Sequence, residues 1–279
     1  MITFTVPQNL RGFIRSHQRV CYAAMFAASS QTIKKLAADQ KHIGGDMPGF
    51  FGVLHTWGRQ MPYHPHIHYI VPGGALSRTD GKWHCSRIDF FLPVKAMSKI
   101  FMAKFRDIMQ KSGLYPQIPS DVWSQQWIVN CQAIGAGEQS IKYLAPYVFK
   151  VAISNNRIVT LEAGNVIFKW RDYRDGNNNK FMTLDVFEFM RRFLLHILPK
   201  GYFKIRYYGI LASRNRRTDL ELCKRLLQVA VKIAEQAKKL SWEDLMLELF
   251  DIDVRRCPVC GKGRLVPKLM IPWNSHAPP

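Results

Sequence analysis

Three stretches in the N-terminal part of the chain are predicted to form β-strands, and in the third of them polar and apolar side chains alternate with a period of two. They cover residues 2–6, 50–57 and 66–71. A short turn at Gly58-Arg59-Gln60 follows the second stretch, so we expect the second and third strands to pair as antiparallel neighbours. The alternation places His66 and His68 on one face of the third strand.

A helical period appears elsewhere in the chain. Between 93 and 112, apolar residues recur every three or four positions, which predicts a helix with one face on the core. The pattern also predicts one or two helices over 11–40 and further helices over 138–150, 184–198 and 218–240. The last of these opens with a capping-box sequence, Thr218-Asp219-Leu220-Glu221. Additional strands are expected at 83–92, 127–134, 158–161, 166–170 and 202–211, and a charged loop at 171–180.

Composition narrows the class of protein. The 279 residues are 47% hydrophobic, which is enough for a normal core, and the sequence contains no apolar run long enough to cross a membrane. Forty Lys and Arg against twenty Asp and Glu give a net charge of +20, which is typical of a nucleic-acid-binding protein. A membrane surface is the rival partner, but the basic residues are not gathered on one amphipathic helix. We therefore expect a soluble cytoplasmic protein that does not bind membranes.

The histidines are the first candidate chemistry. Two imidazoles on one face of a strand, at His66 and His68, form half of a site for a divalent cation. A bare His-x-His is more often part of a solvated sheet face. The expected strand pairing makes His55 the first candidate for a third ligand, although a buried core histidine is an equal alternative. His64 is a weaker alternative because it immediately precedes Pro65.

Two tyrosines are the second candidate. In a helix over 138–150, Tyr143 and Tyr147 lie one turn apart on the same face, and Pro146 is expected to kink the helix between them. Half-buried tyrosines with hydrated hydroxyls are the commoner reading of such a pair. Together with a cation on the histidines, however, a tyrosine hydroxyl can attack a DNA phosphate and leave a covalent phosphotyrosine. This chemistry requires no ATP, and no Walker loop occurs in the sequence.

A pair of cysteines near the C-terminus is the third candidate. Cys257-Pro258-Val259-Cys260-Gly261 has the spacing of half a zinc knuckle. A closed zinc site needs two further ligands, and His276 is the only nearby residue that could serve. Zinc binding within this chain, a remnant of a former site and a site completed elsewhere therefore all remain open. The other four cysteines are scattered among apolar residues and indicate a reducing compartment.

Several of these motifs together resemble the two-tyrosine HUH transposases of bacterial rolling-circle insertion sequences. The resemblance rests on His64-Pro65-His66-Ile67-His68 leading into Val71-Pro72-Gly73-Gly74, and on Tyr143-Leu144-Ala145-Pro146-Tyr147. It also rests on the segments 151–155, 170–176, 193–199 and 207–209, and so covers most of the chain from 50 to 211. The histidine pair precedes the tyrosines, as in transposases and replication initiators.

The resemblance implies an α+β fold, with a central antiparallel sheet flanked by helices. It also implies nicking and strand transfer on single-stranded DNA with Mg²⁺ or Mn²⁺. By the resemblance, His66 and His68 bind the metal while Tyr143 and Tyr147 are the nucleophiles, and His55 remains our choice of third ligand from strand geometry. We expect a catalytic domain over 1–211, a helical region over 212–250 and a tail with the Cys pair over 251–279, where Zn²⁺ could bind.

The chain departs from the family in one respect. Family members usually carry a cysteine-rich zinc region before the first strand, and this chain begins at that strand, so we expect a truncated product or an internal start. Two alternatives stay open at this stage. One is a rolling-circle replication initiator with the same chemistry, and the other is a catalytically inert DNA-binding relative. In a bacterial cell either protein, like a transposase, is expected at the nucleoid.

Overall fold

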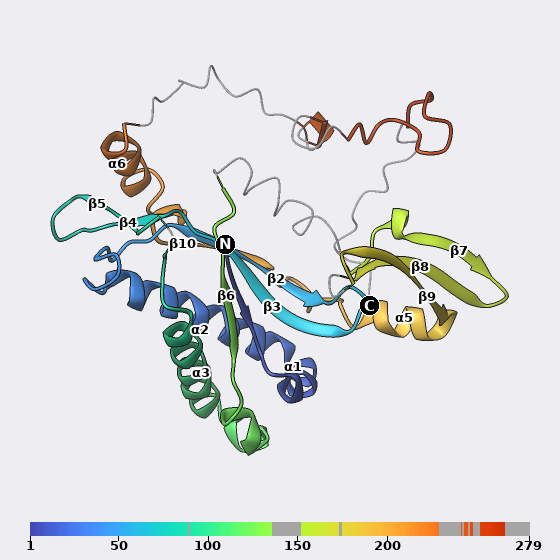
Figure 1. Cartoon of the computed structure of the whole chain (residues 1–279), viewed down its shortest axis with the longest axis horizontal. Helices are drawn as coiled ribbons and strands as arrows, with labels where there is room; N and C mark the ends of the chain where they lie inside the picture. Colours follow the sequence, from blue (N-terminus) through green and yellow to red (C-terminus); the bar gives the residue numbers. More distant parts are fainter. Residues whose placement is uncertain are drawn as a thin grey trace, which may run out of the picture. The chain divides into compact units, whose positions relative to one another are not determined.

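A computed structural model of the chain carries the five-stranded antiparallel sheet that positions the histidines (Figure 1). The structure describes residues 1–88, 90–135, 152–172, 175–228 and 252–265, together with 241, 243, 244, 246 and 247. The strand order is β10-β2-β3-β1-β6, and every neighbouring pair is antiparallel. These strands are β1 (Ile2–Thr5), β2 (Phe50–Trp57), β3 (Tyr63–Ile70), β6 (Ile128–Cys131) and β10 (Ile205–Tyr208). The expected mixed α+β architecture is confirmed.

One face of this sheet is buried beneath helices. The helices are α1 (Arg11–Ser16), α2 (Gln18–Ala38) and α3 (Val94–Lys111). The inward side chains of the strands, such as Phe4 and Ile67, form one cluster with residues of α2 and α3 such as Phe26 and Phe101. Phe4 and Phe101 meet edge to face with ring centroids 5.0 Å apart, an arrangement that adds to the apolar burial. Because side chains alternate between the two faces of a strand, every second side chain of β3 points into this core.

A glycine makes room for the largest core side chain of β3. Gly52 of β2 lies directly opposite Tyr69 in the register. A Cβ atom at Gly52 would lie 2.3 Å from the Tyr69 ring, closer than real Cβ atoms come to any neighbour. The Tyr69 hydroxyl reaches Ser29 Oγ of α2 at 2.7 Å, so its polar end is satisfied inside the core.

The segment 83–92 does not add a strand to the main sheet as expected. Among the described residues of this segment only β5 (Trp83–Cys85) is extended, and it pairs with β4 (Gly74–Leu76) in a separate two-stranded hairpin. The turn at 78–81 folds β5 back onto β4, so the backbone groups of β5 pair with β4 and not with a strand of the main sheet. Leu76 and the partly buried Trp83 pack with Ile210 in a small apolar cluster of their own.

A second sheet follows the region of the tyrosines. It consists of β7 (Ile158–Glu162), β8 (Asn165–Asp172) and β9 (Asn178–Asp185), and α5 (Val186–Leu194) follows directly. Part of the expected loop at 171–180 is therefore strand, since cross-strand pairing of Asp172 with Asn178 continues the hairpin. The expected helix at 184–198 starts two residues later. Asp185 caps it by accepting hydrogen bonds from the backbone N–H groups of Phe187 and Glu188.

The contacts divide the chain into two compact units, 1–229 and 230–279. The last described helix of the first unit is α6 (Asp219–Leu226). Its expected capping box is not formed, because the Thr218 hydroxyl lies against Asn215 O and Asp219 Oδ1 instead of the N–H groups of the helix. Among the residues described, no helix is both long and apolar enough to cross a membrane.

Candidate metal centre and its surroundings

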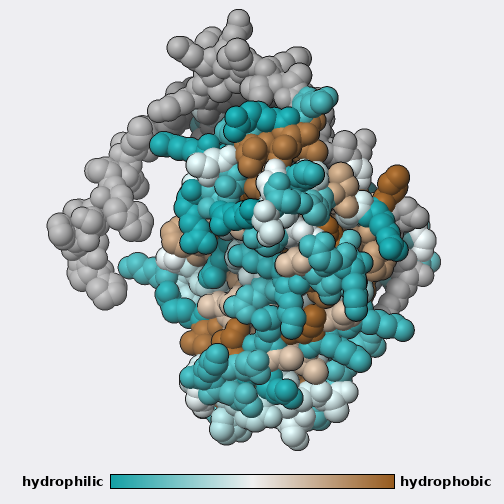
Figure 2. All heavy atoms as spheres, turned by 90° about the vertical axis from the view of Figure 1, so that its left-hand side faces the viewer, coloured by the Kyte–Doolittle hydropathy of each residue, from teal (hydrophilic) through white to brown (hydrophobic). Residues whose placement is uncertain are grey.

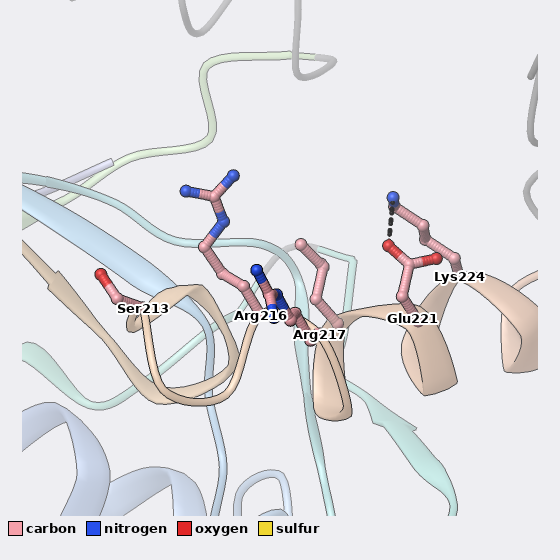
Figure 3. Close-up of a pocket in the computed structure, with 6 residues that line it drawn as sticks. Ser213, Arg216, Arg217, Glu221 and Lys224 are labelled. Atoms are coloured by element: carbon pink, nitrogen blue, oxygen red, sulfur yellow. Dashed lines mark hydrogen bonds and ion pairs between the residues drawn. The ribbon is translucent and has the colours of Figure 1, made fainter. Parts of the chain in front are cut away.

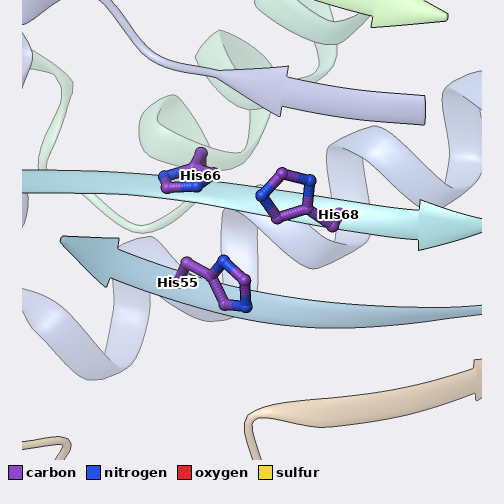
Figure 4. A group of neighbouring side chains, drawn as sticks. All are labelled: His55, His66 and His68. Atoms are coloured by element: carbon purple, nitrogen blue, oxygen red, sulfur yellow. The ribbon is translucent and has the colours of Figure 1, made fainter. Parts of the chain in front are cut away.

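Three histidines gather on the sheet face that is turned away from the helical core (Figure 4). His66 and His68 project from β3, and His55 lies on β2 directly opposite His66 in the register. The β3 residues that follow each of them, Ile67 and Tyr69, are fully buried on the other face. The strand alternation and the pairing across the turn at 58–60 therefore bring the three candidate ligands together as expected.

The geometry of the group suits a single divalent ion after small side-chain rotations. One ring nitrogen of each histidine lies within 4.8 Å of those of the other two. An octahedral ion with ligands at ~2.1 Å needs donor atoms roughly 3 Å apart, so no pair of ring nitrogens has to close by more than about 2 Å. The strands themselves need not move, because rotations about χ1 and χ2 cover that range.

Hydrogen bonds orient two of the rings. His66 Nδ1 lies 2.7 Å from the carbonyl oxygen of His64. A carbonyl oxygen can only accept, so Nδ1 carries the proton and Nε2 offers its lone pair. His68 Nδ1 lies 2.9 Å from Thr3 Oγ1 of β1. When His68 Nε2 binds a metal, Nδ1–H donates to this hydroxyl, as second-shell acceptors do at histidine-ligated metals.

Burial keeps these imidazoles neutral. It lowers the pKa of His66 to about 4, and the positive charge of Arg11 acts in the same direction. Burial also lowers the pKa of His68 to about 3, with smaller contributions from His66 and His64. A neutral imidazole has the lone pair that a metal requires. Both rings are therefore in the metal-binding form throughout the physiological pH range.

Two surrounding residues were missed by the sequence reasoning. Thr3 reaches His68 across 65 positions of sequence, and only the pairing of β1 with β3 brings them together. Arg11, at the start of α1, lowers the pKa values of both His64 and His66 by its charge. Its Nε is buried and has no hydrogen-bond partner among the residues that the structure describes. The sequence contains no local signal for either role, since each depends on a contact between distant elements.

The remaining histidines near the site have different environments. His64 precedes the pair on the same strand, with its ring 5.0 Å from that of His66, but it is not a member of the three-histidine group. His196 is a buried structural residue. Its ring nitrogens lie 3.2 Å from Thr56 Oγ1 and 3.2 Å from the carbonyl oxygen of Met61, so it ties the end of α5 to β2 and its turn.

The cysteine pair of the second unit adopts a tight turn. The Cys257 N–H donates to the Gly263 carbonyl at 2.7 Å, and the Gly263 N–H donates to Cys260 Sγ at 3.2 Å. This N–H donation lowers the pKa of Cys260, which favours the thiolate that binds Zn²⁺. Within the described part of the chain the histidine group is the single cluster of three or more potential ligands, so the pair has no third ligand there. His276 lies outside the described residues.

The two tyrosines expected to act as nucleophiles, Tyr143 and Tyr147, also lie outside the described residues. The described strands on either side of them, β6 and β7, belong to the main sheet and to the second sheet respectively. The segment that carries the tyrosines thus connects two parts of the first unit.

Residues 49–218 match a protein family described as "Putative transposase". A curated relative, "Putative transposase y4qJ" of Sinorhizobium fredii, is 37% identical over 95% of this chain and 71% of its own length. Another, "Transposase for insertion sequence element IS801" of Pseudomonas savastanoi pv. phaseolicola, is 26% identical over 93% of this chain. This chain spans 65% of the length of that second relative. No solved structure matches the chain.

Proposed function

Because the chain belongs to this family of transposases, enzymes that cut and join DNA, we propose that it nicks and rejoins single-stranded DNA through a covalent tyrosine–DNA link. The joining of strands in this way would drive rolling-circle transposition of an insertion sequence. The observation that carries the proposal is the convergence of His55, His66 and His68 on one face of the sheet. The net charge of +20 supports a polyanionic substrate.

The proposed step is a displacement at phosphorus. The phenol oxygen of Tyr143 or Tyr147 attacks a phosphodiester, a Tyr–O–P bond forms, and the bond to the 3′ oxygen breaks. The tyrosine ends on the 5′ phosphate, and the leaving strand takes a proton as a free 3′ hydroxyl. The reverse reaction, with the 3′ hydroxyl of another strand, joins DNA without an external energy source. Two tyrosines would let the protein hold two strands at once.

The chain's own residues prepare the site for a phosphate. His55, His66 and His68 would hold the ion, which when bound would polarise a non-bridging oxygen of the phosphate. His64 O and Thr3 Oγ1 fix the ring orientations of His66 and His68. Arg11 adds a guanidinium whose positive charge acts on His64 and His66 and would attract a phosphate at this site.

The donor set bears on the choice between Mg²⁺ and Mn²⁺. The group consists of three imidazoles and contains no carboxylate. Mg²⁺ binds oxygen ligands by strong preference, whereas imidazole nitrogen suits first-row transition metals better. We therefore favour Mn²⁺ as the ion that this site binds more tightly.

The test is formation of a covalent adduct. The full chain is incubated with labelled single-stranded DNA containing an element end and Mn²⁺, and denaturing electrophoresis detects a protein–DNA product. Tyr143→Phe or Tyr147→Phe should weaken the adduct, and the double variant should abolish it. Tyr207→Phe removes the hydroxyl of a tyrosine that is 57% exposed on β10 and serves as the control. Adduct in the double Phe variant would refute the assignment of the nucleophiles.

A second variant separates cleavage from binding. His66→Ala should abolish the adduct and leave salt-sensitive DNA binding largely intact, because most of the affinity comes from Lys and Arg contacts with phosphates. His84→Ala is a matched control, since His84 lies on β5 and pairs with Asp80 instead of the metal group. Parallel loss of binding and cleavage in His66→Ala would contradict this division of roles.

A further inference from the structure

A basic pocket lies at the end of the fold where β10 leads into α6. Its lining consists of Ser213, Arg216, Arg217, Leu220, Glu221 and Lys224 (Figure 3). Three cations and one carboxylate give the lining a net charge of +2. The left-hand side of Figure 1, where α6 lies, faces the viewer in Figure 2, and hydrophilic residues predominate on that face.

The pocket has a rigid support. Leu220 and Cys223 of α6 pack against Leu76 and Ile210 in an apolar cluster. The preceding turn is fixed by the buried Asn215, whose Nδ2 donates to the Gly209 carbonyl at 2.8 Å. A support of this kind holds the charged side chains at a defined place instead of on a loose tail.

The cations of the pocket are not all neutralised by the fold. Lys224 pairs with Glu221 at 2.7 Å (Figure 3). Arg78 pairs with Asp219 at the start of α6, also at 2.7 Å. Arg216 and Arg217, by contrast, are exposed and have no carboxylate partner among the described residues. Two adjacent guanidinium groups without counter-charges can bind phosphate oxygens with charge-assisted hydrogen bonds.

Positive charge also accumulates beside the pocket. Arg214 is close enough to Lys34 of α2 to contribute to the lowering of the Lys34 pKa, after the larger effect of burial. Neighbouring like charges repel one another and do not stabilise a fold, but they increase the attraction for a polyanion. Since the lining contains one apolar side chain and no aromatic ring, the pocket suits a phosphate backbone better than a base.

The pocket is distant from the histidine group. Gly209 lies against Pro48, immediately before β2, so the pocket is near the start of that strand. His55 is five residues further along β2 than Phe50, a distance of about 17 Å at ~3.4 Å per residue. Roughly five stacked nucleotides span the same distance at 3.4 Å per nucleotide.

We propose that this pocket is a second DNA-binding site, at which Arg216 and Arg217 bind backbone phosphates several nucleotides from the bond that is cut. The proposal rests on the proposed function in that DNA is the substrate. The pocket contributes affinity and positions the strand, with no preference for base sequence. Glu221 limits this affinity because its carboxylate neutralises Lys224 and repels phosphates.

The test measures DNA binding by fluorescence anisotropy over a range of salt concentrations. It uses the full chain in the absence of metal and a single-stranded oligonucleotide of about thirty nucleotides. Arg216→Ala/Arg217→Ala should reduce the slope of log affinity against log salt by about 1.4, since each phosphate contact on a single strand contributes about 0.7. When the salt concentration is raised from 50 to 200 mM, both proteins should lose affinity for DNA. The loss should be on the order of sevenfold greater for the unaltered chain than for the variant.

Two further variants complete the test. Lys95→Ala/Lys99→Ala removes two exposed charges from α3, on the helical face of the sheet, and should leave the slope unchanged. Glu221→Gln should tighten binding and steepen the slope, a gain that misfolding cannot produce. Equal losses in the two double variants, no loss in either, or no gain in Glu221→Gln would overturn the proposal. Adduct formation is not measured here, so failure of the tyrosine mechanism would leave this result intact.

Discussion

The hydroxyl of Thr3 offers a test of the proposed metal site. Thr3→Val replaces this hydroxyl by a methyl group of similar size and removes the acceptor that lies 2.9 Å from His68 Nδ1. Valine is well suited to a β-strand, and Thr3 pairs with His68 and Asn130 through the backbone, which the substitution leaves intact. We therefore expect the fold to persist and the ring of His68 to lose part of its orientation.

Two estimates give the size of the effect. Loss of an acceptor for a partly buried N–H costs about 1–3 kcal/mol. Removal of a second-shell partner of a metal-bound histidine typically weakens metal binding 10- to 100-fold, or roughly 1.4–2.7 kcal/mol. The two ranges overlap, so Thr3→Val should weaken Mn²⁺ binding by about 10- to 100-fold.

The assay is Mn²⁺ titration of the purified chain by calorimetry, with thermal unfolding as a check of the fold. Thr5→Val is the matched control, because Thr5 lies on the same strand opposite His66, and within the described part of the chain its hydroxyl is not seen to bond a histidine ring as that of Thr3 does. Thr3→Ser, which keeps the hydroxyl, should bind Mn²⁺ nearly as tightly as the unaltered chain. Equal Mn²⁺ affinities for Thr3→Val and Thr5→Val would refute the role of Thr3.

Three further predictions concern backbone strain, pH and metal choice. Gly209 has φ +60° and a Cβ there would lie 1.7 Å from Pro48 O, so Gly209→Ala should cost at least about 3 kcal/mol in urea unfolding. Gly201→Ala, at φ +70° in open space, should cost only about 1 kcal/mol; equal costs would contradict the clash. Burial lowers the pKa values of His66, His68 and His196. Below pH ~6.5 the histidines of the unfolded chain therefore bind protons that those of the folded chain do not. The free energy of unfolding of the metal-free protein should decrease as the pH is lowered, by up to ~1.4 kcal/mol per pH unit for each histidine. A free energy of unfolding that stays constant between pH 7 and 5 would argue against neutral buried rings. Adduct formation should need less Mn²⁺ than Mg²⁺ for half-maximal yield, and the reverse order would indicate oxygen ligands at the site.

Local patterns in the sequence were sufficient to predict that the three histidines share one face of the sheet. A strand has a fixed period of two, so His66 and His68 had to share a face once residues 63–70 were extended. The short turn at 58–60 made antiparallel pairing of β2 with β3 the simplest connection, and the register then placed His55 opposite His66. These relations follow from backbone geometry over about fifteen residues, which is why they could be predicted.

Local patterns failed where a competing contact determined the conformation. The polar segment 171–180 lacks the composition of a strand, yet both of its ends are extended because the paired strands β8 and β9 supply cross-strand hydrogen bonds. Thr218 has the sequence of a helix cap, but its hydroxyl contacts Asn215 and Asp219 instead. The hairpin of β4 and β5 likewise forms its own small sheet apart from the main one.

By itself, then, the sequence determined which residue types the protein offers for chemistry and the faces on which neighbouring histidines lie. Only the tertiary structure brought Thr3 to His68 and placed the charge of Arg11 beside His64 and His66. The physical reason is the range of the interactions. Periodicity is set by bonded neighbours, whereas these contacts depend on strand order and helix packing, which bring together residues far apart in the chain.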